Sequence, residues 1–295
     1  MLGLMHLQPL LISSLLTHAA RHHADAEVVS ATSLGAIEHT TWAATESRAR
    51  RLVRALLGLG IKSHDRVGTL AWNDQRHLET YYATSGMQAI CHTINPRLAP
   101  DDIAYIINHA GDSVLFIDPG FASLIGGIAM KIKDSVRAVV MMTDAAGMPA
   151  LDLPAGMRLL CYDTLMDSAD DDYAWPSFDE NTASALCYTS GTTGRPKGVL
   201  YSHRSTVIHA YAIALPDVLD LRATSRILPV VPMFHVNAWG LPFAAAMLGI
   251  KLVLPGPCLD SPSICELFSG EKVTFTAGVP TVWMTMLRYI EEHPE

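Results

Sequence analysis

The chain has 295 residues, 49% of them hydrophobic, which supplies enough apolar material for a sizeable core and argues against a disordered protein. Its formal net charge is −8 with 21 lysines and arginines, so it offers no broad basic surface to a nucleic acid. Five scattered cysteines form no CxxC pair and lie in or beside apolar runs, which predicts buried thiols in a reducing, cytoplasmic compartment.

The N-terminal region predicts two helices. The apolar stretch from Leu10 to Leu16 is too short to span a bilayer, and it lacks the basic flank and cleavage site of a signal peptide. Apolar residues at helical spacing instead predict a helix through Arg21. A second helix is expected from about Thr45 to the glycine at Gly60. We therefore expect no membrane span.

Strand-like runs then alternate with helical segments. Asn73 is the expected N-cap of a helix reaching about Gly86, and Pro100 opens another helix that closes near Gly111. The expected strands are Val67–Trp72, Ala89–Ile94, Ser113–Asp118 and Ala138–Met142. Because several strands are apolar on both faces, the pattern predicts an α/β fold with layered, largely parallel sheets.

An acidic, irregular stretch between Asp167 and Glu180 is the best internal boundary, and a solvated loop explains it better than an interaction tail. It divides the chain into two expected subdomains, 1–180 and 181–295. The α/β alternation then returns, with expected strands at Arg226–Val231, Lys251–Leu254 and Val273–Thr276, and expected helices at about Trp239–Leu248, after Ser261 and from about Pro280.

The segment from Tyr188 to Gly198, YTSGTTGRPKG, carries the clearest chemical signal. Its serine and threonine hydroxyls and three glycines provide donors that can converge on a polyanion, because glycine permits close backbone approach and positive φ. Lys197 adds a cation, and Pro196 stiffens the approach to it. The composition predicts a cradle for a triphosphate.

This segment differs from the common P-loop, in which glycine, four residues and Gly-Lys-Ser/Thr open a helix. Here Gly191 is followed five residues later by Pro196, and the lysine precedes Gly198. The flanking runs Ala183–Cys187 and Val199–Tyr201 read as strands, so the loop is expected to cap a hairpin. Kinase-like phosphoryl transfer is therefore disfavoured.

This run, with Ser202 and His203 after it, resembles the signature of the adenylate-forming superfamily of acyl-CoA synthetases, luciferases and peptide-synthetase adenylation domains. The segment 231–240, VPMFHVNAWG, is similar to the family segment that lines the acyl pocket. A histidine between Phe and Val is by itself more often a core residue, but after a phosphate loop the functional interpretation of His235 is favoured. The segment 276–281 also resembles the family, with a structural strand-to-helix role.

Three further segments, 8–12, 71–73 and 91–97, resemble the medium-chain fatty acyl-CoA and 3-methylmercaptopropionyl-CoA ligases. The resemblance implies that ATP, Mg and CoA are used to adenylate a small or medium-chain carboxylic acid and pass it to CoA. It implies phosphate contacts from Thr189, Ser190, Gly191, Thr192, Thr193, Gly194 and Lys197, with Thr189 near the metal. It places His235 near the reacting carboxylate, names His235 and Lys197 as catalytic, and places His235, Val236, Asn237 and Trp239 in the acyl pocket.

The family's Tyr-Gly-x-Thr-Glu and Thr-Gly-Asp segments, hinge and small C-terminal domain do not occur before Glu295. The resemblance therefore implies the N-terminal half of such an enzyme, with weak ATP binding and no CoA ligation alone. The expected partners are the remaining half or a second copy of the chain. The alternative is a non-catalytic remnant that binds a nucleotide or a partner chain. The 13 histidines show no metal-site spacing.

Overall fold

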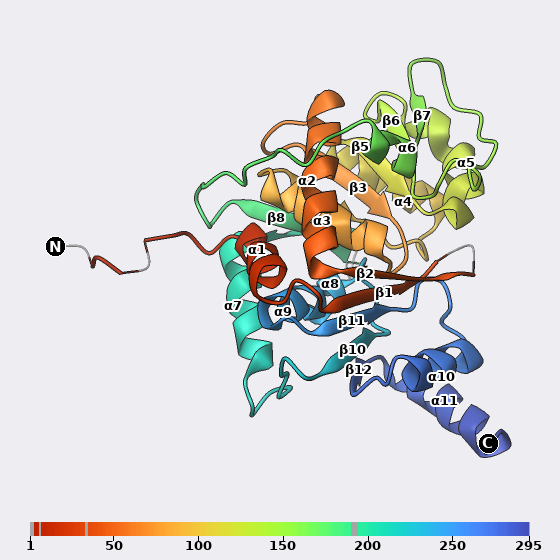
Figure 1. The fold of residues 1–295 in the computed structure, drawn as a ribbon. Coiled ribbons are helices and arrows are strands. Elements are labelled where there is room, and N and C mark those ends of the chain that lie inside the picture. The colour runs from red at the N-terminus through yellow and green to blue at the C-terminus, as the bar shows by residue number, and fades with distance from the viewer. Residues whose placement is uncertain (1–2, 6, 33–34, 190–193, 295) are drawn as a thin grey trace.

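The computed structural model describes residues 3–5, 7–32, 35–189 and 194–294, which form a layered α/β structure (Figure 1). The strands are β1 (Glu27–Ala31), β2 (Ile37–Thr41), β3 (Arg66–Leu70), β4 (Ile90–Thr93), β5 (Asp112–Ile117), β6 (Ala138–Met141), β7 (Arg158–Cys161), β8 (Ala183–Thr189), β9 (Lys197–Ser202), β10 (Arg226–Pro229), β11 (Lys251–Leu254) and β12 (Phe275–Ala277). The α-helices are α1 (Ile12–His22), α2 (Trp42–Gly58), α3 (Gln75–Gly86), α4 (Pro100–Ala110), α5 (Ala122–Ile132), α6 (Tyr162–Asp167), α7 (His203–Ala214), α8 (Val236–Trp239), α9 (Leu241–Leu248), α10 (Ser261–Gly270) and α11 (Pro280–Glu292), with a short 3-10 helix at Pro119–Phe121.

The described strands form two sheets. One has seven strands in the order β7-β6-β5-β3-β4-β8-β9, and the other has five in the order β12-β10-β11-β1-β2. Neighbouring strands run parallel except in the two antiparallel hairpins, β1–β2 and β8–β9. The predicted α/β fold with largely parallel sheets is confirmed, as is the hairpin at β8–β9.

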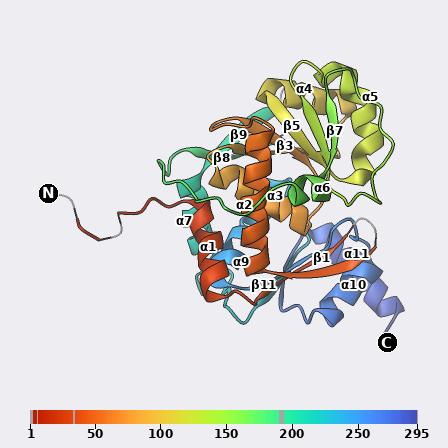
Figure 2. The ribbon, with the colours of Figure 1, turned by 45° about the horizontal axis from the view of Figure 1, so that its top comes forward.

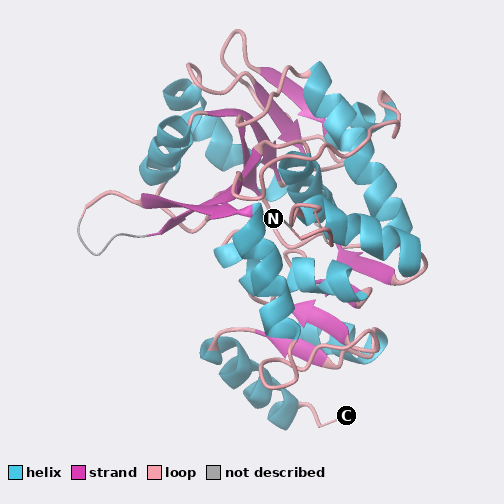
Figure 3. Ribbon diagram, turned by 90° about the vertical axis from the view of Figure 1, so that its left-hand side faces the viewer, coloured by secondary structure: helices cyan, strands magenta, loops and turns pink. Residues whose placement is uncertain are grey.

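Helical layers separate and cover the sheets. Helices α1, α2, α3 and α9 lie between them and share the largest buried cluster with side chains of both sheets. Helices α4 and α5 cover the other face of the seven-stranded sheet (Figure 2), and α10 and α11 cover the other face of the five-stranded sheet. Figure 3 shows this alternation of cyan and magenta layers. The two segments of the candidate site follow the carboxyl ends of β8 and β10.

Local sequence signals explain several helix ends. Helix α4 has Pro100 at its first position, and Gly111 closes it with a φ of 71° in the left-handed region, as predicted. Helix α10 begins after Asp260, whose carboxylate accepts from the Ser263 N–H at 3.0 Å. The strand-to-helix role predicted for residues 276–281 is confirmed, because β12 ends at Ala277 and α11 begins three residues later.

Other expectations need correction. The N-cap of α3 is Asp74, whose carboxylate accepts from the His77 N–H at 2.8 Å, and Asn73 does not serve as the cap. Helix α2 begins at Trp42, three residues before the predicted start, because the Thr41 hydroxyl caps it. The predicted helix near Trp239 begins instead at Leu241, after a left-handed turn. The sequence reading missed the β1–β2 hairpin, β7, α5, α6 and α7.

The predicted boundary near residue 180 falls in an irregular segment between α6 and β8, and both sheets take strands from each side of it. The division into two subdomains stays a prediction. All five cysteines are free thiols; Cys91 and Cys187 are buried and the others partly buried. No helix within the described ranges is long and apolar enough to cross a membrane.

Candidate functional site

The phosphate-loop candidate occupies the turn of the β8–β9 hairpin. Thr189 ends β8 and Lys197 begins β9, and the two are cross-strand partners in the ladder. Both are exposed, and Gly194 has a φ of 97°, which favours glycine. The predicted phosphate contacts Ser190, Gly191, Thr192 and Thr193 lie outside the described residues. Thr189 and Lys197 therefore stand opposite each other where the hairpin opens.

Two side chains of α4 contact this hairpin and join it to the helix. The Tyr188 hydroxyl lies 2.6 Å from His109 Nδ1, and the Arg195 guanidinium lies 4.7 Å from the centre of the Tyr105 ring. Burial raises the pKa of Tyr188 to about 12, so its hydroxyl stays protonated at neutral pH. The sequence reading missed both partners, although Tyr105 and His109 stand four residues apart and so share one face of α4.

A buried histidine–aspartate pair lies on β4 and β5, in the part of the sheet next to this hairpin. His92 Nδ1 on β4 lies 2.6 Å from Asp112 Oδ2 on β5, and both side chains are fully buried. Burial raises the pKa of Asp112, while His92 lowers it by charge and hydrogen bonding. The His92 ring lies 5.1 Å from the Tyr188 ring. The pair supports Tyr188 from within the sheet.

The acyl-pocket candidate is a turn of unusual backbone conformation. Val236, Asn237, Ala238 and Trp239 have φ values of 48°, 50°, 49° and 54°, all in the left-handed region, and Gly240 follows at 74°. Such a conformation is uncommon outside glycine and is a genuine outlier for a β-branched valine. His235 precedes the turn and is exposed, as is Trp239, whereas Asn237 is buried. The surrounding structure must hold this turn in place.

The structure brings the two predicted segments together at Cys187, two residues before Thr189. The Cys187 thiol lies 3.7 Å from Asn237 Oδ1 in the turn and 3.1 Å from the Thr93 hydroxyl on β4. On the other side of the turn, the Trp239 carbonyl lies 3.2 Å from His209 Nε2 on α7. The contact between the segments is a finding, whereas the catalytic and binding roles of their residues stay predictions.

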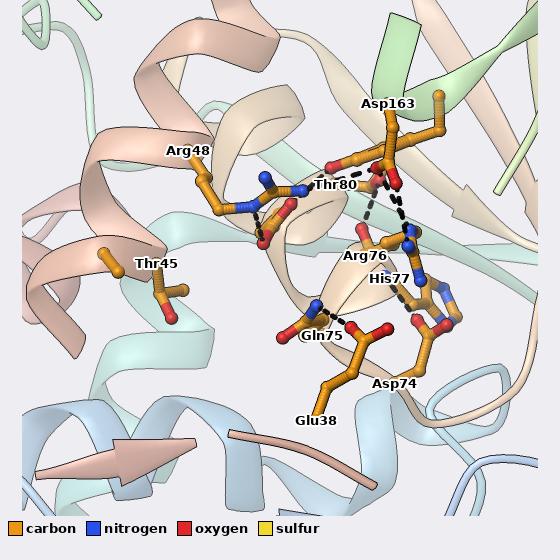
Figure 4. Close-up of polar contacts among 12 residues, drawn as sticks. Glu38, Thr45, Arg48, Asp74, Gln75, Arg76, His77, Thr80 and Asp163 are labelled. Carbon is orange, nitrogen blue, oxygen red and sulfur yellow. Dashed lines mark hydrogen bonds and ion pairs between the residues drawn. The ribbon is translucent and has the colours of Figure 1, made fainter. Parts of the chain in front are cut away.

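A network of charged side chains joins the helices α2, α3 and α6 (Figure 4). Arg48 Nε lies 2.6 Å from Glu79 Oε1, and the Tyr162 hydroxyl donates to Glu79 Oε2 at 2.6 Å. Arg76 binds the two oxygens of Asp163 at 3.3 and 3.0 Å. These bonds fix the position of α3, whose first turn adjoins the candidate site.

Burial also shifts the pKa values of two side chains at the start of α3. It raises the pKa of Asp74 to about 7, even though the His77 N–H and Arg76 favour the charged form. It lowers the pKa of His77 to about 4, so this imidazole is neutral at neutral pH. Its nitrogens lie 2.9 Å from the Trp72 carbonyl and 2.9 Å from the Thr69 hydroxyl. We assign both groups to the support of the loop after β3.

One group of the described side chains could offer ligands to a cation, namely Glu27, His39 and Glu271. Lys251 already lies among them, with its Nζ 2.8 Å from Glu271 Oε2 and in contact with Glu27. The lysine ammonium supplies the positive charge that a metal would bring. We therefore interpret this group as an ion-pair network at the edge of the five-stranded sheet.

Comparison with known proteins gives a consistent result. Residues 16–295 match the family model described as AMP-binding enzyme. The chain is 50% identical over 289 residues to a 3-methylmercaptopropionyl-CoA ligase of Ruegeria lacuscaerulensis, covering 98% of this chain and 53% of the relative. It is 51% identical over 287 residues to a medium-chain-fatty-acid–CoA ligase of Ectopseudomonas oleovorans, covering 97% and 52%. The chain spans about half the length of the curated relatives it matches.

Solved structures agree. An anthranilate CoA ligase in complex with anthranoyl-AMP superposes with a TM-score of 0.82 at 22% identity, covering 95% of this chain and 51% of the other. A fatty acyl CoA synthetase of Mycobacterium tuberculosis superposes with a TM-score of 0.78 at 25% identity, covering 97% and 52%. The first of these likenesses concerns the fold alone.

Proposed function

The chain belongs to the AMP-binding enzyme family, and its relatives are acid–thiol ligases; we propose that it serves the ATP-dependent activation of a carboxylic acid for transfer to CoA. In the first half-reaction a carboxylate oxygen attacks the α-phosphorus of ATP and the bond to pyrophosphate breaks, giving an acyl-adenylate. In the second, the CoA thiol attacks the acyl carbon and AMP leaves. The names of the two relatives described above favour a short or medium-chain acid.

The observation that carries this proposal is the opposition of Thr189 and Lys197 at the mouth of the β8–β9 hairpin, next to the segment that holds His235. The Cβ atoms of directly opposed antiparallel partners lie about 4.5–5.5 Å apart, so both side chains can reach one polyphosphate. An exposed ammonium and hydroxyl stabilise the negative charge that builds up on departing pyrophosphate. A Mg ion near Thr189 would neutralise further phosphate charge.

We propose the following roles for residues of this chain. The residues proposed to hold the phosphates are Thr189, Ser190, Gly191, Thr192, Thr193, Gly194 and Lys197. His235, exposed at the start of the left-handed turn, is proposed to orient the reacting carboxylate, with Val236 and Trp239 beside the acyl chain. Asn237 is buried against Cys187, so its contribution would be to hold the turn.

A weak nucleotide affinity is expected for the chain by itself. Two or three charge-assisted contacts at about 1.5–3 kcal/mol each must exceed an association cost of about 4 kcal/mol or more. Even at the upper end of these ranges the remainder is about 5 kcal/mol, so the dissociation constant is at best of roughly millimolar order. The proposed partner is a chain that supplies the remaining half of such a ligase, and cytoplasmic ATP and CoA would be the co-substrates.

Exposed apolar side chains favour such a partner. Val199 and Leu200 on the edge strand β9 are 39% and 60% exposed, and Tyr211 and Leu215 of α7 or its C-cap are 53% and 55% exposed. Unpaired strand edges beside apolar side chains are typical of surfaces that another segment covers. The same surface fits the second candidate function, a non-catalytic chain that binds a partner without turnover.

The test is pyrophosphate release by the purified chain with Mg-ATP and butyrate, hexanoate or octanoate. It is run for the parent, for Lys197→Ala and for Lys133→Ala, an exposed lysine at the end of α5. Release that needs an acid and is lost only in Lys197→Ala would support adenylation. If release appears only when the remaining half of a relative is added, the chain is an incomplete ligase. No release in either arrangement would contradict the proposal and favour the non-catalytic candidate.

A further inference from the structure

Asn73 follows strand β3 of the seven-stranded sheet, yet its side chain is bonded to the last residue of β10 in the other sheet and to the loop that follows β10. Its Nδ2 donates to the carbonyl oxygens of Pro229 and Val231 at 3.0 and 2.9 Å. Its Oδ1 accepts from the Met233 N–H at 2.6 Å. Its backbone carbonyl accepts from the Gly256 N–H at 2.8 Å, in the loop after β11. One buried residue thus ties together three loops at the candidate site.

The chemistry of this position requires an amide. Asparagine offers two N–H donors and a carbonyl acceptor, and here both donors and the acceptor oxygen are bonded to backbone groups. Alanine at this position would remove the hydrogen-bond partner of two backbone carbonyls and one backbone N–H. Because Asn73 is only 4% exposed, water could not easily replace these bonds. Because Asp74 caps α3, the amide of Asn73 is free for this purpose.

The bonded loop leads directly into the strained turn. Met233 is two residues before His235, and its carbonyl accepts from the Tyr81 hydroxyl. The Phe234 carbonyl is 3.5 Å from the Thr93 hydroxyl, a long contact. Residues in left-handed conformations persist only where their surroundings over-determine them. Three of the side-chain hydrogen bonds to residues 229–233 come from Asn73, beside the bond from Tyr81 and the backbone bonds from Val230 and Val231 to Ala277.

We infer that Asn73 is a positioning residue for acid recognition: by fixing residues 229–233 it sets the place of His235 and Trp239 in the acyl-binding segment. The inference rests on the proposed function of that segment. Asn73 acts through the loop and its bonds do not reach the β8–β9 hairpin. Loss of the Asn73 side chain should therefore raise the KM for the acid much more than the KM for ATP.

The kinetic test compares the parent, Asn73→Ala and a control, Asn108→Ala, in pyrophosphate release. Asn108 is exposed on α4 and donates to the Lys131 carbonyl, away from this loop. We expect the KM for the acid to rise about tenfold to hundredfold in Asn73→Ala, since a displacement of about 1 Å at a reacting group has effects of that size. The KM for ATP should stay close to the parental value. An equal rise of both KM values, or no rise for the acid, would overturn the inference.

Hydrogen–deuterium exchange separates this inference from the proposed function. If the parent releases no pyrophosphate with any acid, the proposed function fails, but the exchange of amides in residues 231–240 still reports on positioning. Asn73→Ala should speed their exchange about tenfold, equivalent to about 1.4 kcal/mol, while β5 and α4 exchange as in the parent. Unchanged exchange in 231–240, or acceleration throughout the chain, would overturn the inference. If Asn73→Ala does not fold, Asn73→Asp is used, because it keeps the acceptor for Met233 and loses both N–H donors to Pro229 and Val231.

Discussion

Replacing Arg48 by methionine tests the charged network that holds α3 behind the candidate site. Glu79 is fully buried, and its partners are Arg48 Nε at 2.6 Å and the Tyr162 hydroxyl at 2.6 Å. Arg48→Met keeps an apolar stem of similar length but leaves the buried carboxylate with one neutral donor. Removing one partner of a buried ion pair costs about 3–5 kcal/mol. Because the Arg48 side chain is 33% exposed, we expect the lower end, about 3 kcal/mol.

The assay is urea unfolding followed by far-UV circular dichroism. The matched control is Arg54→Met on the same helix, whose partner Asp170 is largely exposed. That exposed pair should contribute less than about 1 kcal/mol. The double variant Arg48→Met/Glu79→Gln removes the buried charge and keeps an acceptor for Tyr162. It should recover about 2 kcal/mol of the loss, because an unpaired charge costs more than a missing hydrogen bond.

The stability of Arg48→Met should also depend on pH, through the carboxyl group of Glu79. Burial raises the pKa of Glu79, and Arg48 is the main group that lowers it. Without Arg48 the pKa rises further, so the folded state retains a proton that the unfolded state loses. Stability of Arg48→Met should therefore fall, relative to the parent, as the pH rises from about 5 to about 8. A loss equal to that of Arg54→Met, or a double variant no more stable than the single one, would refute the account.

Three further predictions concern single residues. Burial lowers the pKa of His203 to about 4, so between about pH 6.5 and 4 only the unfolded state binds the extra proton. The free energy of unfolding should therefore fall by up to about 3 kcal/mol as the pH drops through that window. His203→Gln should flatten this part of a urea-unfolding series, and an unchanged slope would contradict the prediction. Asp74→Asn keeps an N-cap residue and removes a carboxyl group whose pKa burial raises to about 7. The free energy of unfolding should therefore increase more at about pH 8 than at about pH 5. A gain that does not depend on pH would argue against a buried charge. Gly256→Ala should lower the free energy of unfolding by about 2–4 kcal/mol, because the φ of Gly256 is 56° and a Cβ would lie 1.9 Å from the Ala31 carbonyl oxygen. Gly127→Ala is the control, because a Cβ on this residue of α5 would meet open space. Equal melting temperatures of the two variants would refute the steric argument.

Local signals in the sequence were sufficient where structure is decided locally. The helix α4 between Pro100 and Gly111 follows from its end residues, and apolar strands such as β6 (Ala138–Met141) follow from composition. The β8–β9 hairpin follows from strand-like runs on both sides of a glycine-rich loop. In contrast, β2 (Ile37–Thr41) is mostly polar and forms a strand because it pairs with β1, so periodicity alone did not reveal it.

The candidate site was predictable as two segments but not as an arrangement. Nothing in the order of residues indicates that Cys187 contacts Asn237, or that four consecutive non-glycine residues from Val236 adopt left-handed conformations, because tertiary contacts impose both. Asn73 shows the same limit. Its type suits a helix cap, but the adjacent Asp74 takes that role and the amide of Asn73 binds the loop around Met233.

The central claim is that the β8–β9 hairpin holds the polyphosphate of ATP through Lys197. Its most direct test is a phosphorus NMR titration of Mg-ATP with the parent chain, Lys197→Ala and the control Lys133→Ala. The account predicts broadening and shifts of the β- and γ-phosphate resonances with the parent and the control, at a roughly millimolar dissociation constant, and a much weaker response with Lys197→Ala. An equal response with Lys197→Ala, or none with the parent, would contradict it.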